Sequence, residues 1–270
     1  MDVLKSFLEE DIGSGDVTTE IIVPEGNGRA EITCEDDAVV AGLLEAEEIF
    51  QIMGLVTEFL VKDGTRVEKG TKVAVVSGSK KKIMTAERTA LNVMMRMSGI
   101  ATMTNNIVTE CRSADQNIIV AGTRKTTPGF RAFEKKAIIL GGGDPHRYGL
   151  YDRILIKDNH IKAAGGVLNA MQLAKNAPSG IKVEIEVENM SDAVIAAENG
   201  ADIILIDNQS PPETKKIKDR IKSIDPKILV EASGRITPEN AKDYAGAADI
   251  ISLGALTHSV KAVHFSLNIL

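Results

Sequence analysis

Charged side chains stand at the ends of short apolar segments throughout the second half of the chain. Arg124 and Lys125 follow NIIVAG, Lys157 ends RILIK, and Asp207 ends ADIILID. Arginine binds a carboxylate or phosphate through two parallel hydrogen bonds, and lysine supplies a compact point charge. Carboxylates bind sugar hydroxyls or a divalent metal through oxygen. The pattern predicts a site for a small substrate that carries several negative charges.

The cationic residues are concentrated in one segment. Residues 124–158 contain eight Lys or Arg against four Asp or Glu, within a chain whose net charge is −6. We expect the substrate clamp to consist of Arg124, Lys125, His146, Arg147 and Lys157. Lys157 lies in an apolar segment and is expected to be buried, so it needs a carboxylate or substrate partner, because an unpaired buried ammonium costs several kcal/mol. Lys135 and Lys136 are assigned to a solvated helix face.

Two further groups of residues complete the expected site. Glu186 and Asp207 end neighbouring strands and are expected to bind sugar hydroxyls or a divalent metal. Glu184 and Glu188 either join them or form salt bridges with helix lysines. The glycine-bearing loops 231–240 and 254–263 each follow a strand and precede a predicted helix, a setting that favours phosphate. The site is therefore expected at the carboxyl ends of the strands.

Six apolar segments, each followed by a helix-like stretch, must position these residues. They are residues 117–122, 153–159, 182–189, 201–208, 227–234 and 249–254. Near-continuous Ile, Val and Leu segments are typical of buried parallel strands, and their alternation with helices predicts a βα barrel. Because only six strands are recognisable, the barrel is expected to be open or incomplete. A doubly wound open sheet remains the alternative, although no GxGxxG follows a strand.

The first half has a different pattern. Short β segments interrupted at Asp63-Gly64 and Lys69-Gly70 predict an antiparallel sheet, and residues 85–112 predict one long helix or two abutting ones with a break at Ser98-Gly99. The expected fold class is α/β, with a mixed α/β N-terminal sandwich domain and an open or incomplete βα barrel. The expected domains are residues 1–102, with 260–270 as a candidate addition, and residues 103–259.

Composition excludes several classes of protein. The negative net charge and 3% aromatic content argue against nucleic-acid binding, and no apolar segment reaches the roughly 20 residues that span a bilayer. The first residues lack the order of a secretory signal, and two cysteines are too few for a disulfide framework. No membrane association and a cytoplasmic location are expected. No His/Cys group has zinc-ligand spacing.

The motifs together resemble the quinolinate phosphoribosyltransferase family, carboxylating nicotinate-nucleotide pyrophosphorylases. In chain order the matching segments are ERTALN, GIAT, TRKTTPGFR, EKKAI, GGGDPHR, LIKDNHI, EIEVEN, DIILIDN, EASG and GALTHS. They extend over nearly the whole chain, and TRKTTPG with GGGDPHR is highly specific. The resemblance implies a mixed N-terminal domain, an open barrel, and conversion of quinolinate and phosphoribosyl pyrophosphate to nicotinate mononucleotide, pyrophosphate and CO₂ with Mg²⁺, in NAD biosynthesis.

The resemblance also implies roles for individual residues. The five clamp residues match the pocket for the two carboxylates of quinolinate, and Lys125, Lys157, Glu186 and Asp207 are the implied catalytic residues. Glu186 and Asp207 match the acids near the ribose and the metal, while the 5′-phosphate cradle corresponds to Ser233, Gly234 and Gly254. Arg88 in ERTALN is similar to an arginine donated by a neighbouring subunit, which implies a homodimer or higher homo-oligomer. Arg235 departs from the family, where glycine is common.

Three other functions are weighed against this one. A homologue linked to molybdenum transport shares much of the motif set and acts on a different acceptor. A Schiff-base aldolase would use Lys157 as its amine. The DGTRVEKG segment, residues 63–70, is similar to the hairpins of lipoyl and biotin carriers but lacks a modifiable lysine at a tight turn. The complete cationic set beside TRKTTPG favours the quinolinate enzyme.

Overall fold

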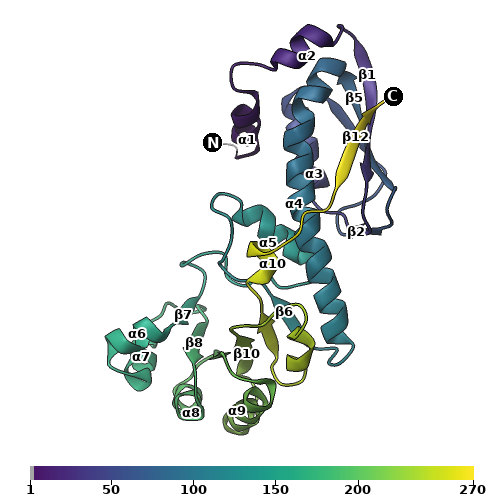
Figure 1. The fold of residues 1–270 in the computed structure, drawn as a ribbon. Coiled ribbons are helices and arrows are strands. Elements are labelled where there is room, and N and C mark those ends of the chain that lie inside the picture. The colour runs from purple at the N-terminus through teal and green to yellow at the C-terminus, as the bar shows by residue number, and fades with distance from the viewer. Residues whose placement is uncertain (1–2) are drawn as a thin grey trace. The chain divides into compact units, whose positions relative to one another are not determined.

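A computed structural model describes residues 3–270 and divides the chain into two compact units (Figure 1). The first unit contains the chain up to Asn105 together with Thr127–Gly142 and Val260–Leu270. The second contains Asn106–Thr126 and Gly143–Ser259. The expected division placed residues 127–142 with the barrel, whereas the structure assigns them to the first unit. No helix among residues 3–270 is long and apolar enough to cross a membrane.

The first unit is built on a four-stranded antiparallel sheet with the strand order β12-β1-β5-β3. These strands are β12 Phe265–Ile269, β1 Asn27–Cys34, β5 Lys72–Ser79 and β3 Val56–Phe59, and β2 Ala38–Val39 pairs separately with β4 Arg66–Val67. The helices are α1 Val3–Ile12, α2 Val17–Ile22, α3 Leu43–Ile52 and α5 Arg131–Leu140. The antiparallel sheet expected from the first half is confirmed, and the C-terminal strand adds to its edge.

The helix α4, Lys80–Arg112, is continuous, so the alternative of one long helix is confirmed and the break expected at Ser98-Gly99 is wrong. Both residues instead form a packing notch on the helix. The Ser98 hydroxyl donates to the Ala41 carbonyl at 3.0 Å and accepts from the Ala41 N–H at 2.9 Å. A Cβ atom on Gly99 would lie only 2.4 Å from the Lys261 carbonyl oxygen. Two small residues therefore allow other chain segments to approach the helix without interrupting it.

The lysines of α5 also differ from the expectation. Lys135 is fully buried, and the Lys136 ammonium donates to Glu45 Oε1 on α3 at 2.7 Å. The assignment of both to a solvated face is wrong, because α5 packs within the first unit. Its C-terminal cap is Gly141.

The second unit contains a six-stranded parallel sheet with the order β6-β11-β10-β9-β8-β7, so all six predicted strands are confirmed. The strands are β6 Ile119–Ala121, β7 Ile154–Ile156, β8 Val183–Val187, β9 Ile203–Asp207, β10 Leu229–Ser233 and β11 Ile250–Ser252. The first strand, β6, pairs with the last, β11, as in a barrel, and the described sheet is open between β6 and β7. The remaining elements are α6 Asp158–Ala164, α7 Val167–Ala174, α8 Met190–Glu198, α9 Pro211–Ile224, the 3-10 helix η1 Ala241–Tyr244 and α10 Ala255–His258.

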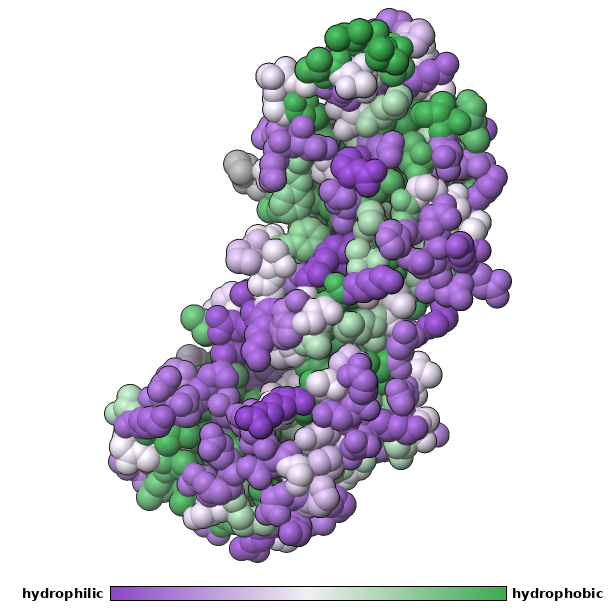
Figure 2. Space-filling view, viewed as in Figure 1, coloured by the Kyte–Doolittle hydropathy of each residue, from purple (hydrophilic) through white to green (hydrophobic). Residues whose placement is uncertain are grey.

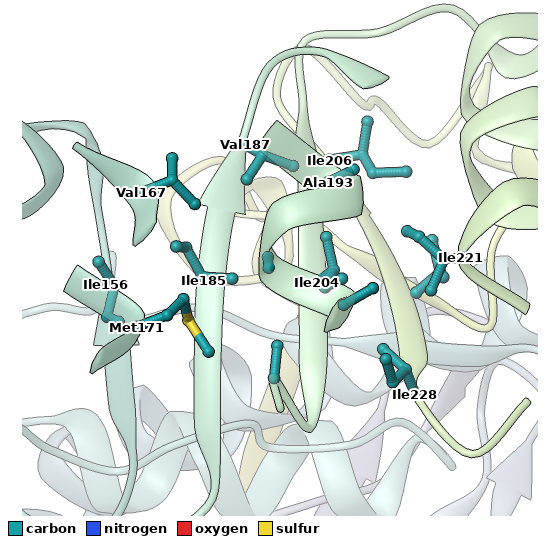
Figure 3. Packing of buried hydrophobic residues seen from close by; sticks show 14 of the residues in the cluster. Ile156, Val167, Met171, Ile185, Val187, Ala193, Ile204, Ile206, Ile221 and Ile228 are labelled. Atoms are coloured by element: carbon teal, nitrogen blue, oxygen red, sulfur yellow. The ribbon is translucent and has the colours of Figure 1, made fainter. Parts of the chain in front are cut away.

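Alternate residues of these strands face opposite sides of the sheet. Ile185 and Val187 of β8 and Ile204 of β9 pack with Met171 of α7 and Ile221 of α9 in one apolar cluster (Figure 3). The register aligns Ile185 with Ile204 across the two strands. Glu184 and Glu186 alternate with these apolar residues and therefore face the opposite side, where the charged site is built.

Candidate active site

A cavity of about 400 Å³ lies at the carboxyl ends of the parallel strands. Its lining includes nine of the eleven predicted site residues: Arg124, Lys125, His146, Arg147, Lys157, Glu186, Asp207, Ser233 and Gly234. We call it the carboxyl-end pocket. Residues from six separate chain segments therefore meet in one pocket, as their positions at strand ends predict.

Two arginines supply the strongest electrostatic indication of a ligand. Arg147 is buried, and its pKa is lowered by burial and by the neighbouring charge of Arg124. The Nε atom of Arg124 is also buried and has no hydrogen-bond partner among residues 3–270. Like charges held close together out of water destabilise one another unless an anion binds between them. The pair is therefore suited to a carboxylate or phosphate.

The loop that carries His146 is fixed to the first strand of the sheet. The Asp144 N–H donates to the Val120 carbonyl at 2.8 Å, and the Gly122 N–H donates to the Asp144 carbonyl at 2.9 Å. Asp144 Oδ1 in turn accepts the His146 N–H at 2.6 Å. These bonds hold His146 at φ 56°, a left-handed conformation that is unfavourable for a residue with a Cβ atom.

Lys157 lies at the N-cap of α6, where its N–H donates to His160 Nδ1 at 2.9 Å. Its ammonium is 2.6 Å from Glu186 Oε2, so the predicted carboxylate partner is present. The expectation that Lys157 is buried is wrong, because its side chain is 46% exposed. The apolar character of β7 ends at Ile156, and the lysine reaches beyond the strand into the open pocket.

Asp207 ends β9, and the adjacent loop approaches it closely. Burial and the negative charge of Glu186 raise the pKa of the Asp207 carboxyl above its usual value. A Cβ atom on Gly234 would lie 2.6 Å from Asp207 Oδ1 and 2.5 Å from Asn208 Oδ1. Gly234 also has φ 83°. Glycine is therefore required at position 234 by both space and backbone conformation.

The second glycine-bearing loop supports Lys125. A Cβ atom on Gly254 would lie 3.0 Å from Lys125 Cδ, and the Thr257 hydroxyl donates to the Lys125 carbonyl at 2.7 Å. The expectation that both loops lead into helices needs correction. Loop 231–240 leads into the four-residue η1, and α10 also has four residues. Helices this short have a small dipole that stabilises a bound anion only weakly. Binding of a phosphate by these loops would therefore depend on the loop N–H groups and on Lys125.

A buried charged group below the pocket was not predicted. Glu184 contacts Arg153 and His146 rather than helix lysines, and Glu231 Oε2 is 3.2 Å from His146 Nε2. One signal was available: Glu184 and Glu231 lie two residues before Glu186 and Ser233, on the same faces of their strands. Their distant partner His146 leaves no sequence pattern. Glu188 is exposed, and its carbonyl accepts from Gln209 Nε2.

Arg88 lies on α4 in the first unit, and its side chain is 58% exposed, with Nη2 3.7 Å from Glu87 Oε1. It is not among the residues that line the carboxyl-end pocket. Its predicted role in a neighbouring subunit stays a prediction.

Comparison with known proteins places the chain in a family. Residues 16–98 match the model of the quinolinate phosphoribosyl transferase N-terminal domain, and residues 100–268 match that of the C-terminal domain. The probable nicotinate-nucleotide pyrophosphorylase (carboxylating) of Archaeoglobus fulgidus is 40% identical over 259 residues, covering 95% of this chain and 98% of the relative. The nicotinate-nucleotide pyrophosphorylase (carboxylating) of Homo sapiens is 37% identical over 269 residues, covering 99% and 90%.

A solved structure agrees with the sequence comparisons. The crystal structure of NadC from Streptococcus pyogenes superposes with a TM-score of 0.93 at 38% identity, covering 100% of this chain and 96% of that chain. Both domain models and full-length relatives therefore match in the expected order, and the chain belongs to the quinolinate phosphoribosyltransferase family.

Proposed function

We propose that the carboxyl-end pocket carries out the reaction of the family, in which quinolinate and phosphoribosyl pyrophosphate give nicotinate mononucleotide, pyrophosphate and CO₂. This makes the chain a carboxylating nicotinate-nucleotide pyrophosphorylase of NAD biosynthesis. The observation that carries the proposal is the pair of buried Arg147 and half-buried Arg124, whose Nε atom is buried and lacks a hydrogen-bond partner among residues 3–270. A pyridine ring with two adjacent carboxylates supplies anions that fit between these two guanidinium groups.

The pocket divides into regions of different chemistry. Arg124, Arg147 and His146 bind the carboxylates, because two guanidinium groups accept planar anions bidentately. Lys125 and Lys157 reach the opening of the pocket, where they contact the reacting groups. The 5′-phosphate of the ribose is bound by the loops at Ser233-Gly234 and Gly254, whose close approach to Asp207 and Lys125 leaves no space for a Cβ atom.

Mg²⁺ fits the acids at the rim of the pocket. Glu186 and Asp207 offer only oxygen, the donor that this ion prefers, and burial and the charge of Glu186 together raise the pKa of Asp207. A cation shared by the two carboxylates would remove that repulsion. When bound, Mg²⁺ supplies positive charge to the pyrophosphate oxygens.

The chain's own residues align the reactants and stabilise charge. The pyridine nitrogen forms a bond to the anomeric carbon as the bond to pyrophosphate oxygen breaks, and the fixed carboxylates hold the ring in line for this attack. Positive charge that develops on the sugar is stabilised by Glu186 and Asp207. The ring, now cationic, accepts the electron pair when the bond to the adjacent carboxylate breaks and CO₂ leaves. A proton then takes its place.

The function is tested with two acceptors. An ultraviolet assay with phosphoribosyl pyrophosphate and Mg²⁺ should show turnover of quinolinate and none of nicotinate. Arg124→Ala should lower kcat/KM for quinolinate about 100-fold. This corresponds to the roughly 3 kcal/mol expected when a carboxylate of the bound substrate loses its guanidinium partner. Arg220→Ala, on the exposed face of α9, is the matched control. Turnover of Arg124→Ala within a few-fold of the native chain would contradict the proposal.

The magnesium assignment has its own measurement. Calorimetric titration of Mg²⁺ in the presence of phosphoribosyl pyrophosphate should give a weaker dissociation constant for Asp207→Asn than for the native chain. Glu198→Gln, an exposed substitution on α8, should leave the constant unchanged. Equal constants for Asp207→Asn and the native chain would remove Asp207 from the metal site.

A homo-oligomer that shares its sites is part of the proposal. Hydrophobic residues gather over α2 in the first unit, where Val17, Ile21 and Ile22 are each at least 70% exposed (Figure 2). Exposed apolar helix faces of this kind commonly mark contacts between proteins. Arg88, with an exposed guanidinium, would enter the pocket of a second copy. An Arg88→Ala chain mixed with an Arg124→Ala chain should regain part of the activity, and no regain after subunit exchange would contradict the shared site.

A cytoplasmic location is also proposed. Cys34 and Cys111 are both buried free thiols, which suits a reducing compartment. Fractionation of cells that produce the chain, with the activity assayed in each fraction, tests the location.

A further inference from the structure

Four charged side chains form a closed group at the floor of the carboxyl-end pocket. They are His146, Arg153, Glu184 and Glu231, and we call them the quartet; Arg153 is its least buried member, with a side chain 21% exposed. Glu184 is 0% exposed and Glu231 1% exposed, while the side chain of His146 is 7% exposed. His146 Nε2 lies 3.2 Å from Glu231 Oε2 and 3.5 Å from Glu184 Oε2. Arg153 Nη1 lies 3.1 Å from Glu184 Oε2 and 3.3 Å from His146 Nε2.

The charges of the quartet balance only if His146 is protonated. Two buried carboxylates carry two negative charges, and Arg153, which stays protonated at any ordinary pH, neutralises one of them. With a neutral imidazole, only Arg153 and the neighbouring Arg147, which is attracted to Glu184, would offset the two buried carboxylates, and Arg147 is also needed for the substrate. Nε2 faces two carboxylate oxygens, at 3.2 and 3.5 Å, and one guanidinium nitrogen, Arg153 Nη1, at 3.3 Å. Attraction to the two carboxylates favours a hydrogen on Nε2 over acceptance from the single guanidinium. The arrangement therefore favours the imidazolium.

The donor set alone could suggest a metal ion, because the nitrogen and the two carboxylate oxygens lie within 4.8 Å of one another. Arg153 already brings a positive charge to the same atoms, however, and a divalent ion would meet that charge at close range. A group that is neutral with an imidazolium and a guanidinium needs no further cation.

The second ring nitrogen of His146, Nδ1, has a different role from Nε2. His146 lines the pocket, and its Nδ1 has no hydrogen-bond partner among residues 3–270. The ring contacts Glu184 on β8 and Glu231 on β10, and the backbone N–H of His146 donates to Asp144 Oδ1. Arg153 faces it from the loop before β7, and Arg124, Lys125 and Arg147 line the same cavity. An Nδ1–H donor of fixed direction is thus available to a ligand.

From this geometry we propose that Glu184 and Glu231 are positioning residues that hold His146 as a fixed imidazolium, whose Nδ1–H binds a carboxylate of the substrate. The proposal rests on the proposed function only for the identity of that carboxylate. Burial alone would lower the pKa of His146, but the hydrogen bonds and charges of Glu184 and Glu231 outweigh burial and raise it to about 9. The two glutamates thereby add a third cation to the Arg124–Arg147 pair at neutral pH.

Nuclear magnetic resonance of the imidazole nitrogens tests the proposal on the native chain. The chain has four histidines, so the His146 signals are assigned as those missing from His146→Gln. At pH 7.5 both His146 nitrogens should show the chemical shifts of an imidazolium, with a titration midpoint near 9. A neutral His146 ring at this pH would overturn the proposal without any variant of the glutamates.

Glu231→Gln removes one charge and keeps the side-chain shape. The His146 midpoint should fall by at least about one pH unit. The KM for quinolinate should stay within about twofold of native at pH 6.5 and rise at least about threefold at pH 8.5, where most variant rings have lost their proton and most native rings keep theirs, with a smaller change in kcat. Glu198→Gln should change neither quantity. An unchanged midpoint, or a KM increase that is equal at both pH values, would overturn the proposal.

The two proposals fail in distinguishable ways. Absence of quinolinate turnover by the native chain contradicts the proposed function, while the nuclear magnetic resonance midpoints still report whether the glutamates hold the imidazolium. Conversely, normal turnover with a neutral His146 contradicts only the role of Glu184 and Glu231.

Discussion

Among residues 3–270, three non-glycine residues adopt left-handed backbone conformations, and all three belong to loops around the site. His146, Asn208 and Arg235 have φ values of 56°, 56° and 53°. Each such conformation costs a non-glycine residue about 1 kcal/mol or more. His146 is held by Asp144, and the Asn208 N–H donates to the Ser233 carbonyl at 2.9 Å. Arg235 is exposed, and no hydrogen bond of its guanidinium is found among residues 3–270.

Arg235→Gly should therefore stabilise the chain. Glycine adopts this conformation without steric cost, so the free energy of unfolding should increase by about 1 kcal/mol. Urea denaturation followed by circular dichroism measures the change. Arg220→Gly is the matched control: Arg220 is exposed within α9, where glycine should lower the free energy of unfolding by about 1 kcal/mol. If Arg235→Gly also lowered the free energy of unfolding, contacts of the Arg235 side chain would outweigh the cost of its left-handed backbone conformation.

Residue types and strand ends were sufficient to predict much of the site, because each strand places its last residues at the same edge. Nine predicted residues line one pocket for this reason. Glu184 and Glu231 could not be assigned, since their partner His146 lies on a loop whose path depends on tertiary bonds to β6. The exposure of Lys157 was also unpredictable from its apolar neighbours, because β7 ends one residue before it.

At the scale of elements, strands were predicted more securely than helices. A buried strand such as ADIILID is apolar along its whole length, and this pattern identifies it without knowledge of its neighbours. The course of α4 through Ser98-Gly99 depends instead on what packs against the helix. Glycine in a sequence is consistent with either a break or a close approach, and only the position of Lys261 distinguishes them.

Gly99→Ala should destabilise the chain even though alanine favours helices. The new methyl group would lie 2.4 Å from the Lys261 carbonyl oxygen and 2.9 Å from Val260 Cγ1. Overpacking of this kind costs about 1–3 kcal/mol, which exceeds the gain of about 1 kcal/mol in helix propensity. Thr109→Ala, on an exposed position of the same helix, should be neutral or slightly stabilising. Thermal denaturation compares the two variants. An increased Tm for Gly99→Ala would contradict the close approach of residues 260–261 to the helix at Gly99.

For the whole molecule, buried titratable groups connect stability to pH. The pKa of His146 is raised to about 9 by Glu184 and Glu231 despite burial. Burial raises the pKa of the Cys111 thiol to about 11 and also raises that of Cys34. Each group has a higher pKa in the folded chain than in the unfolded chain, so each contributes stability that is complete below its unfolded pKa. That stability disappears as pH rises through the folded value.

Stability should therefore fall with pH in two stages. Between about pH 6.5 and 9 the His146 contribution is lost, about 3 kcal/mol for a shift of about 2.5 pH units. Between about pH 9 and 11 the Cys111 thiol loses its contribution. Urea denaturation under reducing conditions at pH 6.5, 9 and 10.5 measures both stages. Glu231→Gln should diminish the first stage alone and Cys111→Ala the second alone, because the two groups lie in separate parts of the second unit. A free energy of unfolding that stays constant from pH 6.5 to 9 would mean that His146 is neutral, and the charge balance inferred for the floor of the pocket would then be wrong.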